Sequence, residues 1–276
     1  MPGLAVTCRR VVHIYRADAG DVVALAGVDL SIAPGEMLAL VGPSGSGKST
    51  LIALLAGLMR PSAGRVMIGT YDIGTLSDGE ISRLRGTELG VVLQGAAGNL
   101  LPYATIARNV WLAQTRAAST KGIKLDDPEQ ILDLVGLGGK GKARIGELAP
   151  GARQRAALAV GIAAGPGLLL LDEPTSQLDS AGRDEVIHAL ETINAERGAT
   201  VVVVTHDSEV GNRLGRAVTI RDGRVGAEGR GGQEFAVVAS DGTVQLPPEV
   251  LDDFPPGTLF AVDRIEGSVA LVPSDE

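Results

Sequence analysis

A glycine-rich segment that ends in a lysine and two hydroxyl residues is the first candidate for chemistry in this sequence. It lies between the apolar run Met37–Val41 and the helix-like run Leu51–Leu58, and it consists of Gly42, Pro43, Ser44, Gly45, Ser46, Gly47, Lys48, Ser49 and Thr50. The glycines let successive backbone amides converge on phosphate groups, and the start of a helix adds positive potential. Lys48 would reach the β and γ phosphates, and Ser49 would ligate Mg²⁺. The spacing therefore favours a phosphate-binding loop (P-loop) over a chance glycine turn.

Two acidic residues follow a run of four leucines further along the chain. Asp172 and Glu173 come directly after Leu168–Leu171. A carboxylate at the end of a buried strand can hold Mg²⁺ through water, which is the role predicted for Asp172, and Glu173 would act as the general base that polarises the attacking water. A pair that merely caps a helix is the alternative interpretation.

A histidine follows another apolar run. His206 comes after Val201–Val204, where a third strand end would approach the same phosphates. A lone histidine is more often structural, so the residue by itself leaves its role open.

Strand-like apolar runs alternate with helix-length segments such as Gly182–Glu196. The runs are Val22–Leu25, Met37–Val41, Val66–Ile68, Leu89–Leu93, Leu168–Leu171 and Val201–Val204. Continuous apolar strands between helices predict an α/β fold with a largely parallel sheet covered on both faces. Between Leu76 and Ala164 the pattern is mostly helical, which predicts an inserted helical subdomain over about residues 76–164.

The composition limits the class of protein. The chain has 276 residues, of which 45% are apolar but only 3% aromatic, so its core must be aliphatic. A single cysteine, Cys8, excludes an internal disulfide and a cysteine-based metal site, and it fits a reducing compartment. The uncharged stretch 156–171 is short and broken by glycine and proline, so we expect no transmembrane helix, no signal peptide and a cytoplasmic location.

The net charge of −8 belongs to the end of the chain. Residues 1–225 are balanced, whereas residues 226–276 carry ten acidic and two basic residues. Such an excess of acid disfavours binding to nucleic acid or to an anionic membrane surface. Glycine-rich residues 226–233 are predicted to be a linker, and residues 234–276 a small β-rich appendage with turns at Asp241-Gly242 and Glu266-Gly267.

Together these segments resemble the nucleotide-binding domain of ABC transporters, over residues 4 to about 225. Residues 168–179, with the sequence LLLLDEPTSQLD, are similar to the Walker B motif and D-loop of that family. The resemblance implies a P-loop NTPase core that binds ATP and Mg²⁺ and hydrolyses ATP. It also implies further site residues: Gln94 as the magnesium- and γ-phosphate-sensing Q-loop that faces the membrane partner, His206 as the switch histidine, Asp179 in the D-loop, and Tyr15 stacked on adenine. Core packing is the alternative for Tyr15.

Residues after Gln94 resemble one branch of this family. The segment contains Asn99, Leu100, Leu101, Pro102, Thr105, Asn109 and Val110, and it is similar to lipoprotein-release, macrolide-export and cell-division ATPases. Those proteins pair with separately encoded permeases. The resemblance therefore implies a dimeric ATPase subunit, peripheral on the inner face of the cell membrane, that powers a permease. The alternative is a soluble ABC-type ATPase or a regulatory ATP switch not coupled to transport, which the single P-loop and the lack of heptads disfavour.

The family's signature loop, LSGGQ, is altered here. It aligns with Leu148, Ala149, Pro150, Gly151 and Ala152. In the family this loop covers the nucleotide of the opposite subunit, where Ala149 has no hydroxyl and Pro150 no amide proton to donate. Gly151 retains its amide. We expect low basal hydrolysis by this chain alone, because a homodimer would carry two weakened loops, whereas the partner in a heterodimer could supply a normal loop.

The acidic appendage is similar to AbrB-like swapped-hairpin modules, which dimerise. Its charge disfavours DNA, so the resemblance implies dimerisation or a regulatory contact. A plain structural extension remains the alternative.

Overall fold

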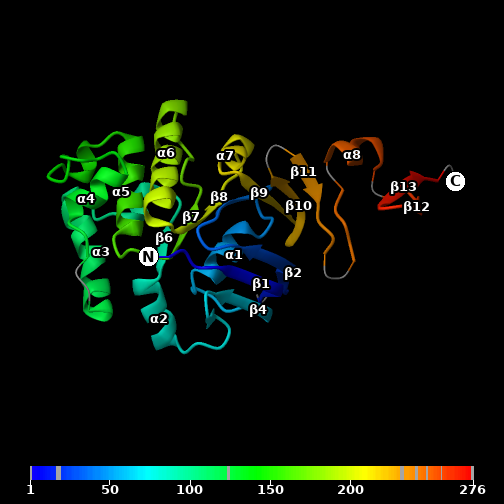
Figure 1. The fold of residues 1–276 in the computed structure, drawn as a ribbon, viewed down its shortest axis with the longest axis horizontal. Helices are drawn as coiled ribbons and strands as arrows, with labels where there is room; N and C mark the ends of the chain where they lie inside the picture. The colour runs from blue at the N-terminus through cyan, green and yellow to red at the C-terminus, as the bar shows by residue number, and fades with distance from the viewer. Residues whose placement is uncertain are drawn as a thin grey trace.

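The computed structural model describes residues 2–16, 20–122, 125–230, 233–239, 242–246, 248–255 and 257–274. Within them, helices lie over a central sheet, with a second, antiparallel sheet beside it (Figure 1). No helix in these ranges is long and apolar enough to cross a membrane.

The central sheet confirms the predicted α/β fold. Its strand order is β11-β10-β9-β3-β8-β7-β6, with parallel pairing from β9 through β3, β8 and β7 to β6. These strands are β3 (Met37–Val41), β6 (Leu89–Val92), β7 (Leu168–Asp172), β8 (Thr200–Val204), β9 (Arg216–Arg221), β10 (Arg224–Arg230) and β11 (Gln233–Ala236). The strands from β9 to β6 all run the same way, so their carboxyl ends meet at one edge of the sheet.

Both faces of the central sheet are buried, which explains why its strands lack polar alternation. In β7, Leu169 and Leu171 belong to one apolar core, and Leu168 and Leu170 to the other. The first core contains the inserted helices α3 (Ile106–Lys121), α4 (Pro128–Leu134) and α5 (Pro150–Ile162), and also α6 (Ser180–Arg197). The second contains α1 (Lys48–Leu55) and the antiparallel sheet.

The inserted subdomain is mostly helical, as predicted. Helices α3, α4 and α5 group at the end of the molecule opposite the C-terminus (Figure 1). The remaining helical elements between β5 and β7 are α2 (Asp78–Thr87), η1 (Ala96–Asn99) and η2 (Ile145–Glu147).

The antiparallel sheet has the order β2-β1-β4-β5. Its strands are β1 (Val6–Tyr15), β2 (Val22–Ile32), β4 (Ala63–Ile68) and β5 (Tyr71–Asp72). The sequence pattern locates the first residues of β2 and misses the rest, because the strand continues through Gly27 and Asp29. It also predicts no strand over β1, although Val6, Cys8 and Val11 are fully buried or nearly so.

The predicted linker differs from the structure. Residues 226–230 lie in β10, which pairs with β9 from Arg224 to Arg230, and the remaining linker residues 231 and 232 lie outside the described ranges. Arg216 of β9 donates to Glu228 of β10 at 2.8 Å and to Glu36 at 2.8 Å. Burial favours the neutral form of the Glu228 carboxyl, but the hydrogen bonds from Arg216 and Arg230 outweigh it and lower its pKa. The glycine content conceals this strand, which pairs with β9 across the short turn at Asp222-Gly223.

The end of the chain keeps part of the predicted pattern. The hairpin of β12 (Phe260–Ile265) and β13 (Ser268–Pro273) turns at Glu266-Gly267 as expected, and α8 (Pro248–Asp253) precedes it. Strand β11 pairs with β10, so Phe235 and Ala236 extend the central sheet rather than a separate appendage. Residues 243–246 form only a single bridge, Val238–Val244, and Asp241 of the other predicted turn lies outside the described residues.

Two short helices complete the fold. Helix α7 (Ser208–Arg213) follows β8 and packs on β3, while α8 lies beyond the central sheet, on the side of the C-terminus (Figure 1). The division into a domain at 1–225 and an appendage at 234–276 stays a prediction.

Candidate functional site

The glycine-rich loop connects β3 to α1 and has the backbone that only glycine adopts easily. Gly42, Gly45 and Gly47 have φ angles of 144°, 79° and 104°. A Cβ on Gly42 would lie 2.2 Å from the carbonyl oxygen of Ile220, and one on Gly47 would lie 2.5 Å from that of Ala24. The glycines therefore permit both the turn and its close packing on β9 and β2.

Lys48 closes over this loop. Its side chain is buried, and Nζ donates to the carbonyl oxygens of Gly42 and Pro43, both at 2.7 Å. Burial lowers the pKa of the ammonium group, while the nearby Glu173 and Asp172 carboxylates act in the opposite direction. The cation is thus held above the loop, where a phosphate would meet it.

Helices α1 and α5 begin without a side-chain cap. Helix α1 starts after Gly47 and α5 after Ala149, and neither residue caps the free amides of the first turn. In contrast, side chains cap the five helices α2, α3, α4, α6 and α7, through Ser77, Thr105, Asp127, Asp179 and Asp207. Uncapped amides at a helix start suit an anion, and in α1 they face the same loop as Lys48.

The two carboxylates lie at the end of β7, as the pattern predicts. Asp172 accepts a hydrogen bond from the Ser49 side chain. Burial raises the pKa of Asp172 and the adjacent Glu173 adds to the rise, while the Ser49 hydrogen bond and Lys48 oppose it. A hydroxyl and a carboxylate oxygen side by side are ligands that Mg²⁺ prefers, so the residues present fit that ion.

Glu173 and His206 meet across the ends of β7 and β8. Nδ1 of His206 lies 2.9 Å from Oε2 of Glu173. Glu173 has a φ of 50°, and its backbone amide donates to the carbonyl oxygen of Val204 at 2.9 Å. A non-glycine residue in this conformation is strained and is often found at functional sites. The structure thus brings together the proposed general base and the histidine that sequence alone left open.

Tyr15 and Gln94 are both exposed, Tyr15 beside the start of α1 and Gln94 just beyond the end of β6. Tyr15 is 42% exposed, and its hydroxyl lies 3.2 Å from Oγ1 of Thr50 in α1. Its ring is edge-on to His13 rather than enclosed in the core, which favours the binding role over core packing. Gln94 is exposed directly after β6, at the same edge of the sheet as Asp172.

Gly151 and Asp179 form a second group on α5 and α6. A Cβ on Gly151 would lie 3.3 Å from Cα of Gly182, and Oδ1 of Asp179 accepts from the Gly182 amide at 2.8 Å. Pro150 is the first residue of α5, a position that proline tolerates well.

Some residues that support the site cannot be recognised from the sequence motifs alone. Asn99 is predicted only as part of a family branch, yet its side chain binds Leu93 and Gly95 and so fixes the loop that carries Gln94. Arg183 is not predicted at all, although it contacts Asp207, the neighbour of His206. The role of Asn99 could have been inferred from the sequence, because it lies only five residues after Gln94. The contact of Arg183 with Asp207 joins residues 24 positions apart, so only the tertiary structure reveals it.

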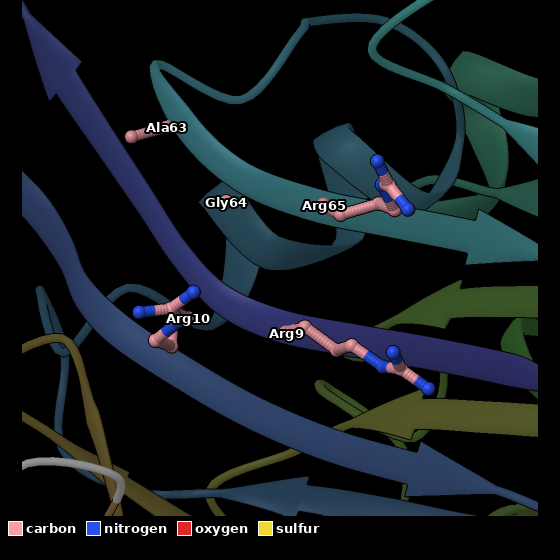
Figure 2. Close-up of a pocket in the computed structure, with 5 residues that line it drawn as sticks. All are labelled: Arg9, Arg10, Ala63, Gly64 and Arg65. Atoms are coloured by element: carbon pink, nitrogen blue, oxygen red, sulfur yellow. The ribbon is translucent and has the colours of Figure 1, made fainter.

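A hollow of about 510 Å³ lies elsewhere, on the antiparallel sheet. Arg9, Arg10, Ala63, Gly64 and Arg65 line it (Figure 2). A bulge in β1 puts the two adjacent arginines on the exposed side, and Arg65 pairs with Asp72 at 3.2 Å. This positively charged face is separate from the P-loop.

Comparisons with known proteins agree with this geometry. Residues 25–176 match the family model described as ABC transporter. Over 214 residues the chain is 41% identical to the lipoprotein-releasing system ATP-binding protein LolD of Anaeromyxobacter dehalogenans, which covers 76% of this chain and 89% of that protein. It is 38% identical to the macrolide export ATP-binding/permease protein MacB of Rhodopirellula baltica, which covers 78% of this chain but only 32% of MacB.

Solved structures give the same result. The dimeric structure of the ATP-binding cassette MJ0796, in a post-hydrolysis state bound to ADP and Pi, has a TM-score of 0.72 and 31% identity, covering 83% of this chain and 100% of that one. The structure of cbiO1 from Clostridium perfringens, part of the ABC transporter complex cbiONQ, has a TM-score of 0.70 and 27% identity, covering 82% of this chain and 88% of that one. The family match over residues 25–176 and the similarity to almost the whole of LolD show that this chain belongs to the ABC transporter family.

Proposed function

We propose that this chain is the ATP-hydrolysing subunit of a transporter whose permease is a separate protein. The proposal rests on the contact between Glu173 and His206 at 2.9 Å. The P-loop lysine, Lys48, lies close enough to the Glu173 and Asp172 carboxylates for them to affect its pKa. Phosphoryl transfer depends mainly on positioning and charge neutralisation, and this group of residues provides both.

Each residue has a role that follows from its place. The amides of the loop and of the first turn of α1 would hold the phosphates, and Lys48 would exchange its carbonyl partners for phosphate oxygens. Glu173 would accept a proton from the attacking water, and His206 would orient Glu173 and face the γ phosphate. Tyr15, beside Thr50, would stack on adenine, and Gln94 would monitor the γ phosphate.

Mg²⁺ fits between Ser49 and Asp172, and Gln94 would join them. When bound, the ion neutralises phosphate charge. A cation held there would favour the ionised form of Asp172, whose pKa is otherwise raised by burial.

The relatives support a dimer and a membrane partner. LolD is an ATP-binding protein of a lipoprotein-releasing system, MacB unites ATP-binding and permease parts, and MJ0796 was solved as a dimer. In such a dimer the P-loop of one subunit would face the start of α5 of the other. We therefore place this chain on the inner face of the cell membrane, bound to a permease, and expect no nucleic acid.

The start of α5 predicts slow hydrolysis by the isolated chain. Ala149 offers no hydroxyl and Pro150 no amide, so a partner's phosphate would find mainly the Gly151 and Ala152 amides there. Hydrogen bonds to charged groups contribute about 1.5–3 kcal/mol each, and the loss of one weakens the closed dimer about tenfold or more.

Light scattering of the full chain carrying Glu173→Gln, with and without MgATP, tests this proposal. A doubling of mass with MgATP supports a homodimer, and a monomer that doubles only when an ABC ATPase with an intact signature loop is added supports a heterodimer. Retained hydrolysis in Lys48→Ala would contradict the assigned site. Co-purification of the wild type with RNA or DNA, rather than with an integral membrane protein, would favour the alternative of a soluble ABC-type ATPase.

A further inference from the structure

An ion-pair network joins the two groups of site residues. The guanidinium of Arg183, in the first turn of α6, donates from NH1 to Oδ2 of Asp207 at 3.0 Å, and its NH2 lies 2.9 Å from Oε2 of Glu209. The backbone amide of Arg183 donates to the carbonyl oxygen of Asp179 at 2.9 Å. One side chain therefore connects the helix start that carries Asp179 to the residue next to His206.

Asp207 is held on several sides. Its Oδ1 accepts from the Glu209 amide at 2.9 Å, which caps α7, and its own amide donates to Oγ1 of the buried Thr205 at 3.1 Å. Burial favours the neutral form of Asp207, but the α7 amides and the Arg183 hydrogen bond outweigh it and lower the pKa of this carboxyl. Asp207 is thus an ionised anchor, with Oδ1 directed to α7 and Oδ2 to α6.

The position of His206 depends on this anchor. The imidazole side chain is 70% exposed, so little packing fixes it apart from the contact with Glu173. The charged groups around it are Glu173 after β7, Asp207 and Glu209 at the start of α7, and Arg183 from α6. The guanidinium of Arg183 holds two carboxylates, those of Asp207 and Glu209, at the start of α7. It therefore restrains the backbone that directly follows His206.

We propose that Arg183 is a positioning residue for hydrolysis, which fixes His206 against Glu173 through Asp207 and couples that contact to the start of α6. This inference rests on the proposed function. The competing explanation is that Asp207 merely caps α7 and that Arg183 adds only a surface ion pair.

The chain offers a matched control in a second ion pair between the same two helices. Arg213 of α7 contacts Asp184 of α6 at 2.5 Å, with a side chain 38% exposed, compared with 25% for Arg183. This pair lies at the opposite end of α7 from Asp207. Arg213→Gln therefore removes an α6–α7 ion pair without touching the neighbour of His206.

The test compares Arg183→Gln, Arg183→Lys and Arg213→Gln in the full chain. We expect Arg183→Gln to lower kcat for MgATP about tenfold with KM unchanged, because the loss concerns positioning and not nucleotide binding. Arg183→Lys keeps the charge but loses the fork, so its kcat should lie between those of Arg183→Gln and the wild type. Arg213→Gln should leave kcat within twofold of the wild type.

A spectroscopic readout separates positioning from stability. With ¹⁵N-histidine label and no nucleotide, the His206 ring nitrogens should shift in Arg183→Gln and stay unchanged in Arg213→Gln, while both variants unfold at similar temperatures. Unchanged His206 signals and kcat in a folded Arg183→Gln protein would overturn the proposal. The NMR result does not depend on hydrolysis, so failure of this inference is distinguishable from failure of the proposed function, which Lys48→Ala tests.

Discussion

The starts of α1 and α5 are alike in one respect and opposite in another. In neither helix does a capping side chain accept a hydrogen bond from the backbone amides of the first turn. Gly47 enters α1 with a φ of 104°, whereas Ala149 enters α5 in an extended conformation with a φ of −61°. The loop before α1 requires glycine, while the start of α5 tolerates alanine and proline.

This difference explains which half of the site can vary. Around α1 the glycines pack against the carbonyl oxygens of Ile220 and Ala24, so a side chain there would displace neighbouring strands. At the start of α5, Ala149 and Pro150 are exposed, and proline suits the first turn of a helix. The fold therefore constrains the P-loop glycines, whereas in the proposed dimer the donors of α5 would serve the nucleotide of the other subunit.

The largest effect is expected for Lys48→Ala. Removing the cation that lies above the P-loop should reduce hydrolysis by about 100-fold or more, because charge on the phosphates is then left unneutralised. The measurement is phosphate release with MgATP. Arg60→Ala, which removes an exposed cation paired with Asp78, is the control and should retain activity. Comparable activity in the two variants would mean that the start of α1 is not the phosphate site.

Glu173→Gln distinguishes an effect on the chemical step from an effect on MgATP binding. The substitution keeps the shape of the side chain but removes the base, so hydrolysis should fall about 100-fold while MgATP affinity stays within about threefold. Single-turnover hydrolysis and nucleotide titration measure the two quantities. A parallel loss of affinity would contradict the assignment of Glu173 to the chemical step.

Restoring donors at the start of α5 is expected to increase activity. Ala149→Ser with Pro150→Gly returns a hydroxyl and an amide, which should raise hydrolysis by up to about tenfold in a homodimer. The dependence of the rate on protein concentration should also shift to lower concentrations. Ala195→Ser, at an exposed alanine near the end of α6, is the control; an equal rise with it would show that the two restored donors are not responsible.

The smallest effect is expected at a helix whose first turn is capped by a side chain. Asp127 caps α4 and accepts from the Glu129 amide at 2.9 Å. Asp127→Ala should lower the free energy of unfolding by about 1 kcal/mol and leave hydrolysis unchanged. Urea unfolding and phosphate release check both statements. A large loss of activity would mean that the capped helices also serve the site.

Much of the site could be predicted from local sequence. The P-loop and the Asp172-Glu173 pair depend on residues adjacent in the chain, and parallel strands bring their ends to one edge. The contact between Glu173 and His206, the enclosure of Lys48 and the role of Arg183 join residues far apart in sequence. Local patterns cannot reveal such pairs.

The sequence by itself determined the α/β class, the aliphatic strands and the candidate phosphate-binding residues, because each of these depends on short-range periodicity or on glycine geometry. Only the tertiary structure decided that residues 226–230 form a strand of the central sheet. The physical reason is the backbone pairing of this segment with β9, and the ion pairs of Arg216 with Glu228 and Glu36 compensate the burial of these charged side chains. The same holds for Asp207, whose carboxylate is fixed by two helices that meet only when the chain is folded.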